Sequence, residues 1–183
     1  MLGGSGRVIM VSGASRGLGL AIAKRLHEAG FTVAAGARNP AAVAVKDRLS
    51  ADRYDAEEAG SAEAWVEAVA TRYGRIDGLV NCAGINPKVR VMDAGEESLD
   101  QMWRINVKGP LRVTRAAIPH LVKSGKGRVI NVASLAGRRV GSNVGYAMTK
   151  FAVVALTPTA SARNYGTAAC ALPPSAQVTS RPT

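Results

Sequence analysis

The sequence predicts an α/β protein built on one parallel β-sheet with helices on both faces, a doubly wound arrangement. Two observations support this fold class. Short runs rich in valine, isoleucine and alanine alternate with longer segments whose apolar residues recur at helical spacing. The short runs are apolar at nearly every position, which is typical of strands buried on both faces and hence of parallel sheets. We therefore expect a single domain in which helices connect parallel strands.

The first strand–helix–strand crossover is expected at residues 7–37. An apolar run at 7–12 predicts a strand, and apolar residues at helical spacing follow until Gly30, which is placed to end the helix. A second apolar run at 31–37 predicts the next strand. A unit of about 30 residues fits one crossover, which requires parallel strands and a right-handed connection.

The alternation of strands and helices continues along the chain. Gly109 and Pro110 are expected to bend the longest helix, because proline has no N–H group to donate. In order, we expect a strand before Asp55, a helix at 61–73, a strand at 78–83, a helix at 98–122, a strand at 128–133 and a last helix from about Asn143.

The charge distribution bears on possible partners. The 183 residues carry 24 Lys and Arg against 13 Asp and Glu, a net charge of +11, and residues 101–183 contain no acidic residue. This excess raises the hypothesis of a basic nucleic-acid-binding domain. The basic residues are scattered, however, with little aromatic interleaving for base stacking, so we expect no nucleic-acid partner.

Composition also bears on compartment and metal content. No apolar run approaches the roughly 20 residues that a membrane span needs, so we expect no membrane association. The two cysteines are too few for a disulfide scaffold, and the N-terminus lacks the pattern of a signal peptide. These features favour the cytoplasm. No cluster of His, Cys and acidic residues has ligand spacing, so no metal site is expected.

A glycine-rich segment between the first strand and the first helix is the main candidate for ligand binding. It reads Ser-Gly-Ala-Ser-Arg-Gly-Leu-Gly, from Ser12 to Gly19. Its glycines permit a tight turn and close approach of a phosphate, and the following helix offers free N–H groups. The alternative is an ordinary strand–helix turn. We predict a Rossmann-type dinucleotide site with contacts from Gly13, Ser15, Arg16, Gly17, Leu18 and Gly19.

Two arginines bear on the choice between the nicotinamide dinucleotides. In this fold an acidic residue near the end of the second strand binds the ribose 2'-hydroxyl, whereas a basic residue there binds a 2'-phosphate. No acidic residue lies between Glu28 and Asp47, while Arg38 follows Gly19 by 19 residues. Arg38 and Arg16 could flank one phosphate, so we favour NADP(H). The alternative is that both arginines are solvated surface charges.

A tyrosine and a lysine with helical spacing are the candidate catalytic pair. Tyr146 and Lys150 are four residues apart, so on a helix their side chains share one face. The pKa of an unperturbed tyrosine is about 10, and a neighbouring ammonium favours its phenolate. Ser134 follows a predicted strand at the edge where such sheets bind ligands, and its hydroxyl could hydrogen-bond a substrate carbonyl.

Taken together, these motifs resemble the short-chain dehydrogenase/reductase family. Besides the glycine loop, the resemblance rests on Asn81-Cys82-Ala83-Gly84, on Asn106 within Arg-Ile-Asn-Val, on Ser134, and on Tyr146-x-x-x-Lys150, in the expected order and spacing. It extends from about residue 8 to 157. Ser12 stands where the family more often has threonine, and Cys82 replaces the second asparagine of Asn-Asn-Ala-Gly.

The resemblance implies a function and a set of roles. Hydride would pass between the nicotinamide and the carbonyl carbon of a small-molecule carbonyl or alcohol substrate, while Tyr146 exchanges the proton. Lys150 would also hold the nicotinamide ribose, Asn106 would keep a water in the proton relay, and Asp55 would contact the adenine. The resemblance further implies a homodimer or homotetramer formed through the long helices. The remaining implied cofactor contacts are Asn81, Ala83 and Gly84.

Three function classes follow from these observations. The first is an NADP(H)-dependent oxidoreductase acting on a carbonyl or alcohol. The second is a nucleotide-binding fragment or regulator without turnover, and the third is the nucleic-acid-binding domain. Oxidation of cofactor by a panel of ketones separates the first two, and salt-dependent binding of DNA or RNA is what the third requires.

The end of the sequence differs in composition from the rest. We assign residues 1–157 to the nucleotide-binding domain and 158–183 to an atypical tail, since Ala, Thr, Pro and Ser make up 18 of residues 157–183. Pro158 is expected to interrupt the helix of Lys150. We hypothesise that the reading frame is altered near Thr157, a natural truncation being the rival. The last sheet strands would then be missing, and the chain is expected to aggregate or oligomerise and to have little activity.

Overall fold

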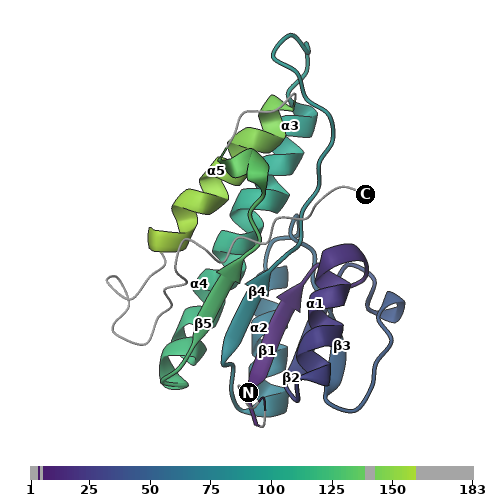
Figure 1. The fold of residues 1–183 in the computed structure, drawn as a ribbon, viewed down its shortest axis with the longest axis vertical. Helices are drawn as coiled ribbons and strands as arrows, with labels where there is room; N and C mark the ends of the chain where they lie inside the picture. The colour runs from purple at the N-terminus through teal and green to yellow at the C-terminus, as the bar shows by residue number, and fades with distance from the viewer. Residues whose placement is uncertain (1–3, 5, 139–142, 160–183) are drawn as a thin grey trace.

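The computed structural model describes residues 4, 6–138 and 143–159, which form one parallel sheet with its helices (Figure 1). The strands are β1 (Val8–Ser12), β2 (Thr32–Ala37), β3 (Leu49–Arg53), β4 (Gly78–Asn81) and β5 (Arg128–Asn131). All pairings are parallel, in the order β3-β2-β1-β4-β5. The α/β fold class is therefore confirmed.

Three of the four predicted helices form where expected, and the predicted helix at 98–122 is divided into three segments. The helices are α1 (Gly17–Glu28), α2 (Ser61–Tyr73), α3 (Glu97–Met102), α4 (Gly109–Lys123) and α5 (Val144–Thr159), with short 3₁₀ turns at Pro40–Ala42 and Leu135–Gly137. The predicted long helix is observed as α3 and α4, joined without a break by a π-helical stretch at Trp103–Lys108. Gly109 and Pro110 begin α4 directly after this stretch. Proline is tolerated in the first turn of an α-helix, where its missing N–H group leaves no α-helical hydrogen bond unmade.

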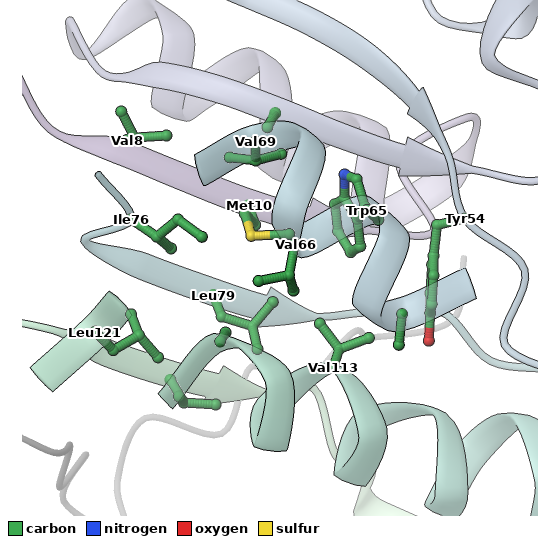
Figure 2. Close-up of a cluster of buried hydrophobic side chains, with 14 of the residues drawn as sticks. Val8, Met10, Tyr54, Trp65, Val66, Val69, Ile76, Leu79, Val113 and Leu121 are labelled. Atoms are coloured by element: carbon green, nitrogen blue, oxygen red, sulfur yellow. The ribbon is translucent and has the colours of Figure 1, made fainter. Parts of the chain in front are cut away.

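The core has two layers, one on each face of the sheet. On one face, Met10 and Leu79 pack against side chains of α2 and α4, including Trp65 and Val113 (Figure 2). On the other face, β1 and β2 pack against α1 through residues such as Val11 and Ala23. This alternation of neighbouring strand residues between two apolar layers explains why the strands read as continuous apolar runs.

The strands β4 and β5 end earlier than the sequence suggests. The runs at 78–83 and 128–133 were expected to be strand throughout, but β4 ends at Asn81 and β5 at Asn131. After Asn81 the chain turns toward the glycine loop, where the N–H groups of Cys82 and Ala83 donate to Ser12 Oγ at 3.0 and 3.1 Å. Hydrogen bonding to a side chain there replaces strand pairing.

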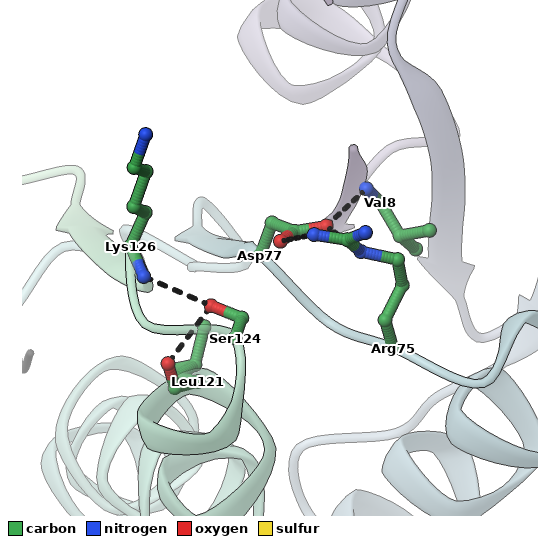
Figure 3. Close-up of polar contacts among 6 residues, drawn as sticks. All are labelled: Val8, Arg75, Asp77, Leu121, Ser124 and Lys126. Carbon is green, nitrogen blue, oxygen red and sulfur yellow. Dashed lines mark hydrogen bonds and ion pairs between the residues drawn. The ribbon is translucent and has the colours of Figure 1, made fainter. Parts of the chain in front are cut away.

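An ion pair between the buried Asp77 and the half-exposed Arg75 fixes the opposite end of the sheet. The Asp77 carboxylate accepts hydrogen bonds from the Val8 N–H at 2.9 Å and from the Arg75 guanidinium at 2.6 and 2.8 Å (Figure 3). It thereby ties the start of β1 to the segment that enters β4. Nearby, Ser124 Oγ donates to the carbonyl oxygen of Leu121 and closes the end of α4.

The helix α5 extends slightly further than predicted. It continues to Thr159, so the interruption expected at Pro158 does not occur at that residue. Proline fixes φ near the helical value, and a proline near a helix end removes only one hydrogen bond. Residues 160–183, which contain most of the assigned tail, lie outside the described residues. The boundary at 157 and the altered reading frame remain predictions.

Candidate active site

The glycine loop is packed closely against the turn after β4 and against itself. Gly13 has φ +69°, and a Cβ atom on it would lie 2.7 Å from the Ala83 Cα. A Cβ on Gly19 would collide with the carbonyl oxygen of Gly13. In contrast, Gly17 has φ +55° with open space where a Cβ would stand. The loop therefore needs glycine for packing at two positions and leaves its backbone accessible at the third.

A cleft of about 290 Å³ runs from this loop across the ends of β1, β2, β3 and β4. It lies beside the start of α1, whose first turn contains no acidic residue and whose cap residue Arg16 makes no side-chain hydrogen bond to it. The helix N-terminus thus presents free N–H groups and a positive dipole end to the cleft. The predicted cofactor residues that line this cleft are Gly13, Ser15, Arg16, Gly17, Leu18, Gly19, Arg38, Asp55, Ala83 and Gly84.

Arg16 and Arg38 both line this first cleft and are both exposed. Neither guanidinium takes part in an ion pair with another described residue. Asp55 lines the same cleft, and its side chain accepts a hydrogen bond from the Glu57 N–H at 3.0 Å. The residues fit a dinucleotide, because a glycine cradle, a helix N-terminus and two cationic groups face one groove.

A second cleft, also of about 290 Å³, adjoins the first. Leu18, Cys82, Gly84 and Ile85 line both clefts, so the two lie side by side. The second cleft contains three of the four predicted catalytic residues, Ser134, Tyr146 and Lys150.

Lys150 is the buried charge of the second cleft. Its side chain extends from α5, and its Nζ donates to the carbonyl oxygen of Val132 at 3.0 Å and lies 5.5 Å from the centroid of the Tyr146 ring. Only 7% of Lys150 is exposed, and this burial lowers the pKa of its ammonium. Burial raises the pKa of the Cys82 thiol, while the charge of Lys150 acts in the opposite direction.

Ser134 caps a turn and still has a donor to offer. Its Oγ accepts a hydrogen bond from the Ala136 N–H at 3.2 Å at the start of the 3₁₀ turn. A serine hydroxyl can accept and donate at once, so this cap leaves its proton available to another oxygen. The capping role and the predicted ligand role are therefore compatible.

Asn106 is buried, and its side chain is engaged by the protein. Its Oδ1 accepts from the Ile85 N–H at 2.9 Å, and its Nδ2 donates to the Ile85 carbonyl at 2.9 Å and to Thr149 Oγ1 at 3.2 Å. Thr149 Oγ1 in turn donates to the carbonyl oxygen of Tyr146. Asn106 thus joins the turn after β4 to α5, and its position in the π-helical stretch is consistent with a functional irregularity.

One predicted cofactor residue is not brought to either cleft. Asn81 is 3% exposed, and its Nδ2 donates to Thr114 Oγ1 at 3.1 Å and to Asn131 Oδ1 at 2.8 Å. It ties β4 to α4 and β5. Several lining residues were not predicted from the sequence, although they follow the ends of strands or lie in the π-helical stretch: Ala37, Tyr54, Ala56, Ile85 and Ile105.

The described residues offer neither a metal-binding cluster nor a membrane-spanning helix. Within residues 4, 6–138 and 143–159, no three His, Cys, Asp or Glu side chains gather closely enough to hold a metal ion. None of the helices in this described part of the chain combines the length and apolar character needed to span a bilayer.

The arrangement was compared with known proteins. The sequence model of the family described as short chain dehydrogenase matches residues 7–168. The chain belongs to the short chain dehydrogenase family. The match includes the glycine loop and the Tyr146 and Lys150 pair, as the motifs predicted.

Two curated proteins illustrate the similarity in sequence. An agropine synthesis reductase from Rhizobium rhizogenes is 42% identical in an alignment of 164 positions that covers 83% of this chain and 37% of that protein. An uncharacterized oxidoreductase from Staphylococcus epidermidis is 33% identical over 157 residues, covering 82% of this chain and 68% of that protein. The chain thus spans little more than a third of the length of the agropine synthesis reductases that it matches.

Solved short chain dehydrogenase structures share the fold. A short-chain dehydrogenase from Streptomyces avermitilis has a TM-score of 0.83 and 32% identity, covering 91% of this chain and 64% of that chain. A gluconate 5-dehydrogenase from Burkholderia cenocepacia, solved in complex with NADP and tartrate, has a TM-score of 0.82 and 29% identity, covering 88% and 68%.

Proposed function

We propose that the chain carries the cofactor-binding and proton-transfer site of an NADP(H)-dependent oxidoreductase that acts on a small carbonyl or alcohol. The observation that carries this proposal is that the two clefts are adjacent and share the lining residues Leu18, Cys82, Gly84 and Ile85. A dinucleotide in the first cleft would extend its nicotinamide end toward the second. When bound, the nicotinamide supplies or accepts a hydride.

The residues of the second cleft would handle the proton and orient the substrate oxygen. In the direction of reduction, Tyr146 donates its phenolic proton to the carbonyl oxygen, and in oxidation it takes the proton back. The Lys150 ammonium lies 5.5 Å from the Tyr146 ring centroid, beside the proposed proton donor. The Ser134 hydroxyl, which only accepts in its hydrogen bond with the Ala136 N–H, donates its proton to the same substrate oxygen and holds that oxygen in place.

The preference for NADP(H) is supported by the rim of the first cleft. Arg16 and Arg38 both line it, and guanidinium groups suit a 2'-phosphate because they make charge-assisted, bidentate hydrogen bonds. The gluconate 5-dehydrogenase that shares the fold was solved with NADP. Asp55 lines the same cleft and is proposed to contact the adenine.

We further propose a homodimer as the working assembly, in the cytoplasm. An apolar hollow lies over α5 and the π-helical stretch, lined by Trp103, Val144, Ala147, Met148 and Phe151. Nearly half of the Phe151 and Met148 surfaces are exposed there, and a second copy of the chain would cover them. Light scattering on the wild type and on Phe151→Glu tests this, since the charge would return a dimer to the monomer.

Binding and turnover are tested separately. NADPH and NADH are titrated into the chain with cofactor fluorescence as the readout, and NADPH oxidation is then followed with a panel of ketones. Tighter binding of NADPH with ketone-dependent oxidation supports the proposal. Binding without turnover identifies a nucleotide-binding fragment or regulator instead. Equal affinity for the two cofactors contradicts the role of the arginines.

A further inference from the structure

The side chain of Asn143, just before α5, has an amide whose orientation is fixed. Its Oδ1 accepts hydrogen bonds from the N–H groups of Tyr146 and Val89 at 3.2 and 3.3 Å. Its Nδ2 donates to the carbonyl oxygen of Pro87 at 2.8 Å and to Asn86 Oδ1 at 2.7 Å. Backbone N–H groups only donate and carbonyl oxygens only accept, so a flipped amide would lose these bonds.

This orientation determines how Asn86 is presented. Because Asn143 Nδ2 is the donor, the Asn86 amide must accept with its oxygen, and its NH₂ group is then the end that faces away from Asn143. Asn86 is exposed and lines the second cleft together with Ser134, Tyr146 and Lys150. A neutral hydrogen-bond donor is therefore held at the wall of the cleft that contains the proposed proton donor.

The turn that carries Asn86 is held firmly in place. The neighbouring Ile85 is bonded through both its N–H and its carbonyl to Asn106, and the N–H of Val144 donates to the Val89 carbonyl at 3.2 Å. The turn after β4 is thus attached to the π-helical stretch before Asn86 and to α5 after it. A donor fixed in this way discriminates between ligands more sharply than one on a free loop, because less conformational entropy is lost on binding.

We propose that Asn86 is a specificity-determining residue that selects carbonyl substrates with a second, hydrogen-bond-accepting oxygen, and that Asn143 is the positioning residue that orients it. This inference rests on the proposed oxidoreductase function. The reacting carbonyl oxygen is taken by Tyr146 and Ser134, so the Asn86 NH₂ group meets another part of the substrate. A ketone, ester or hydroxyl oxygen suits a neutral donor, whereas a methylene group would leave it without a partner.

The test compares two ketones that differ at the second position. Ethyl acetoacetate carries an accepting ester group, and methyl pentyl ketone has carbon atoms along the same length. The two ketones differ in intrinsic reactivity. We therefore compare, between variants, the kcat/KM for ethyl acetoacetate divided by the kcat/KM for methyl pentyl ketone. In Asn86→Asp, a carboxylate still accepts from Asn143 but offers oxygen where the NH₂ group stood, which keeps the turn in place.

The ratio is expected to fall about three- to tenfold in Asn86→Asp and in Asn86→Ala, with the loss confined to ethyl acetoacetate. Lys88→Gln is the matched control, because it changes the charge of the same exposed turn by the same amount and leaves the Asn86 amide unaltered. Asn143→Ser can still cap α5 but cannot hold Asn86, so its ratio should fall toward that of Asn86→Ala.

Several outcomes decide between the inference and the function on which it rests. An unchanged ratio in Asn86→Asp and Asn86→Ala overturns the role of Asn86 and leaves the oxidoreductase proposal intact. If the wild type reduces neither ketone, turnover by this chain is contradicted. The role of Asn86 is then tested by binding of the two ketones to the NADPH complex. Asparagine side-chain amide NMR signals are then followed in the NADPH complex. A shift of the Asn86 NH₂ signal with ethyl acetoacetate alone supports the inference, and no difference between the ketones overturns it.

Discussion

The Nζ of Lys150 lies 5.5 Å from the centroid of the Tyr146 ring, one helical turn away on α5. The same nitrogen donates to the Val132 carbonyl, which holds the ammonium beside the aromatic face. This placement has a cost, since the ammonium is removed from water and its pKa is lowered by burial.

The lowered pKa of Lys150 predicts a pH dependence of stability. Below the folded pKa both states are protonated and the buried charge destabilises the fold. Between the folded pKa and the unfolded value of 10.5, the unfolded chain binds more protons, so this contribution to the free energy of unfolding rises with pH. The difference between the wild type and Lys150→Met, measured by urea denaturation, should therefore shift in favour of the wild type as the pH is raised toward 10.5. A constant difference would contradict the buried charge.

Substitution of Tyr146 by phenylalanine separates proton transfer from binding. The ring and its contact with Lys150 remain, while the phenolic proton is lost. We expect kcat to fall by about 100- to 10,000-fold, with NADPH affinity almost unchanged. Steady-state kinetics in an active form of the enzyme and fluorescence titration measure the two quantities. A variant that keeps most of its rate removes Tyr146 from the mechanism.

Reversing the charge of Arg38 should change the cofactor preference. Arg38→Asp removes a cation from the first cleft and supplies a carboxylate for the ribose hydroxyls, so NADPH affinity should fall at least about tenfold and NADH affinity should rise. Lys24→Asp is the control, because Lys24 is exposed on α1 and does not line the first cleft. Equal losses in the two variants would indicate a general effect of charge.

Removal of the Asp77 carboxylate, which lies at the end of the sheet opposite the clefts, should lower the stability of the fold. Burial tends to raise the pKa of Asp77, but the hydrogen bonds from Arg75 and from the Val8 N–H outweigh it, and the pKa is lowered. Its stabilisation is therefore present above the unfolded value of 3.8 and is lost as pH falls through the folded pKa. At neutral pH, Asp77→Ala should lower the free energy of unfolding by roughly 2 to 3 kcal/mol.

The control for this substitution is another aspartate with different exposure. The side chain of Asp77 is 1% exposed, whereas that of Asp47 is 94% exposed beside Arg48. Asp47→Ala should therefore change the free energy of unfolding by less than about 1 kcal/mol, as measured by urea denaturation. Similar losses at the two positions would mean that Asp77 contributes little through its buried contacts.

The sequence by itself determined the fold class and most of the first cleft. Gly13, Gly17 and Gly19 identified the loop because their backbone requirements are local, and the spacing of Tyr146 and Lys150 placed both on one helical face. Local periodicity also located α2 at its observed bounds. Such features depend on residues close together in the chain, which is why a single sequence reveals them.

The tertiary structure decided which polar side chains face the clefts and which are used internally. Asn81 belongs to a predicted cofactor motif but is bonded to Thr114 and Asn131. Asn143, which the sequence predicts only as the approximate start of the last helix, determines how Asn86 is presented. These partners are separated by tens of residues, and an asparagine amide can serve any of them equally well. Only the packing of β4 against its neighbours and of the following turn against α5 chooses among them, because each buried amide must be satisfied by the groups that the fold brings to it.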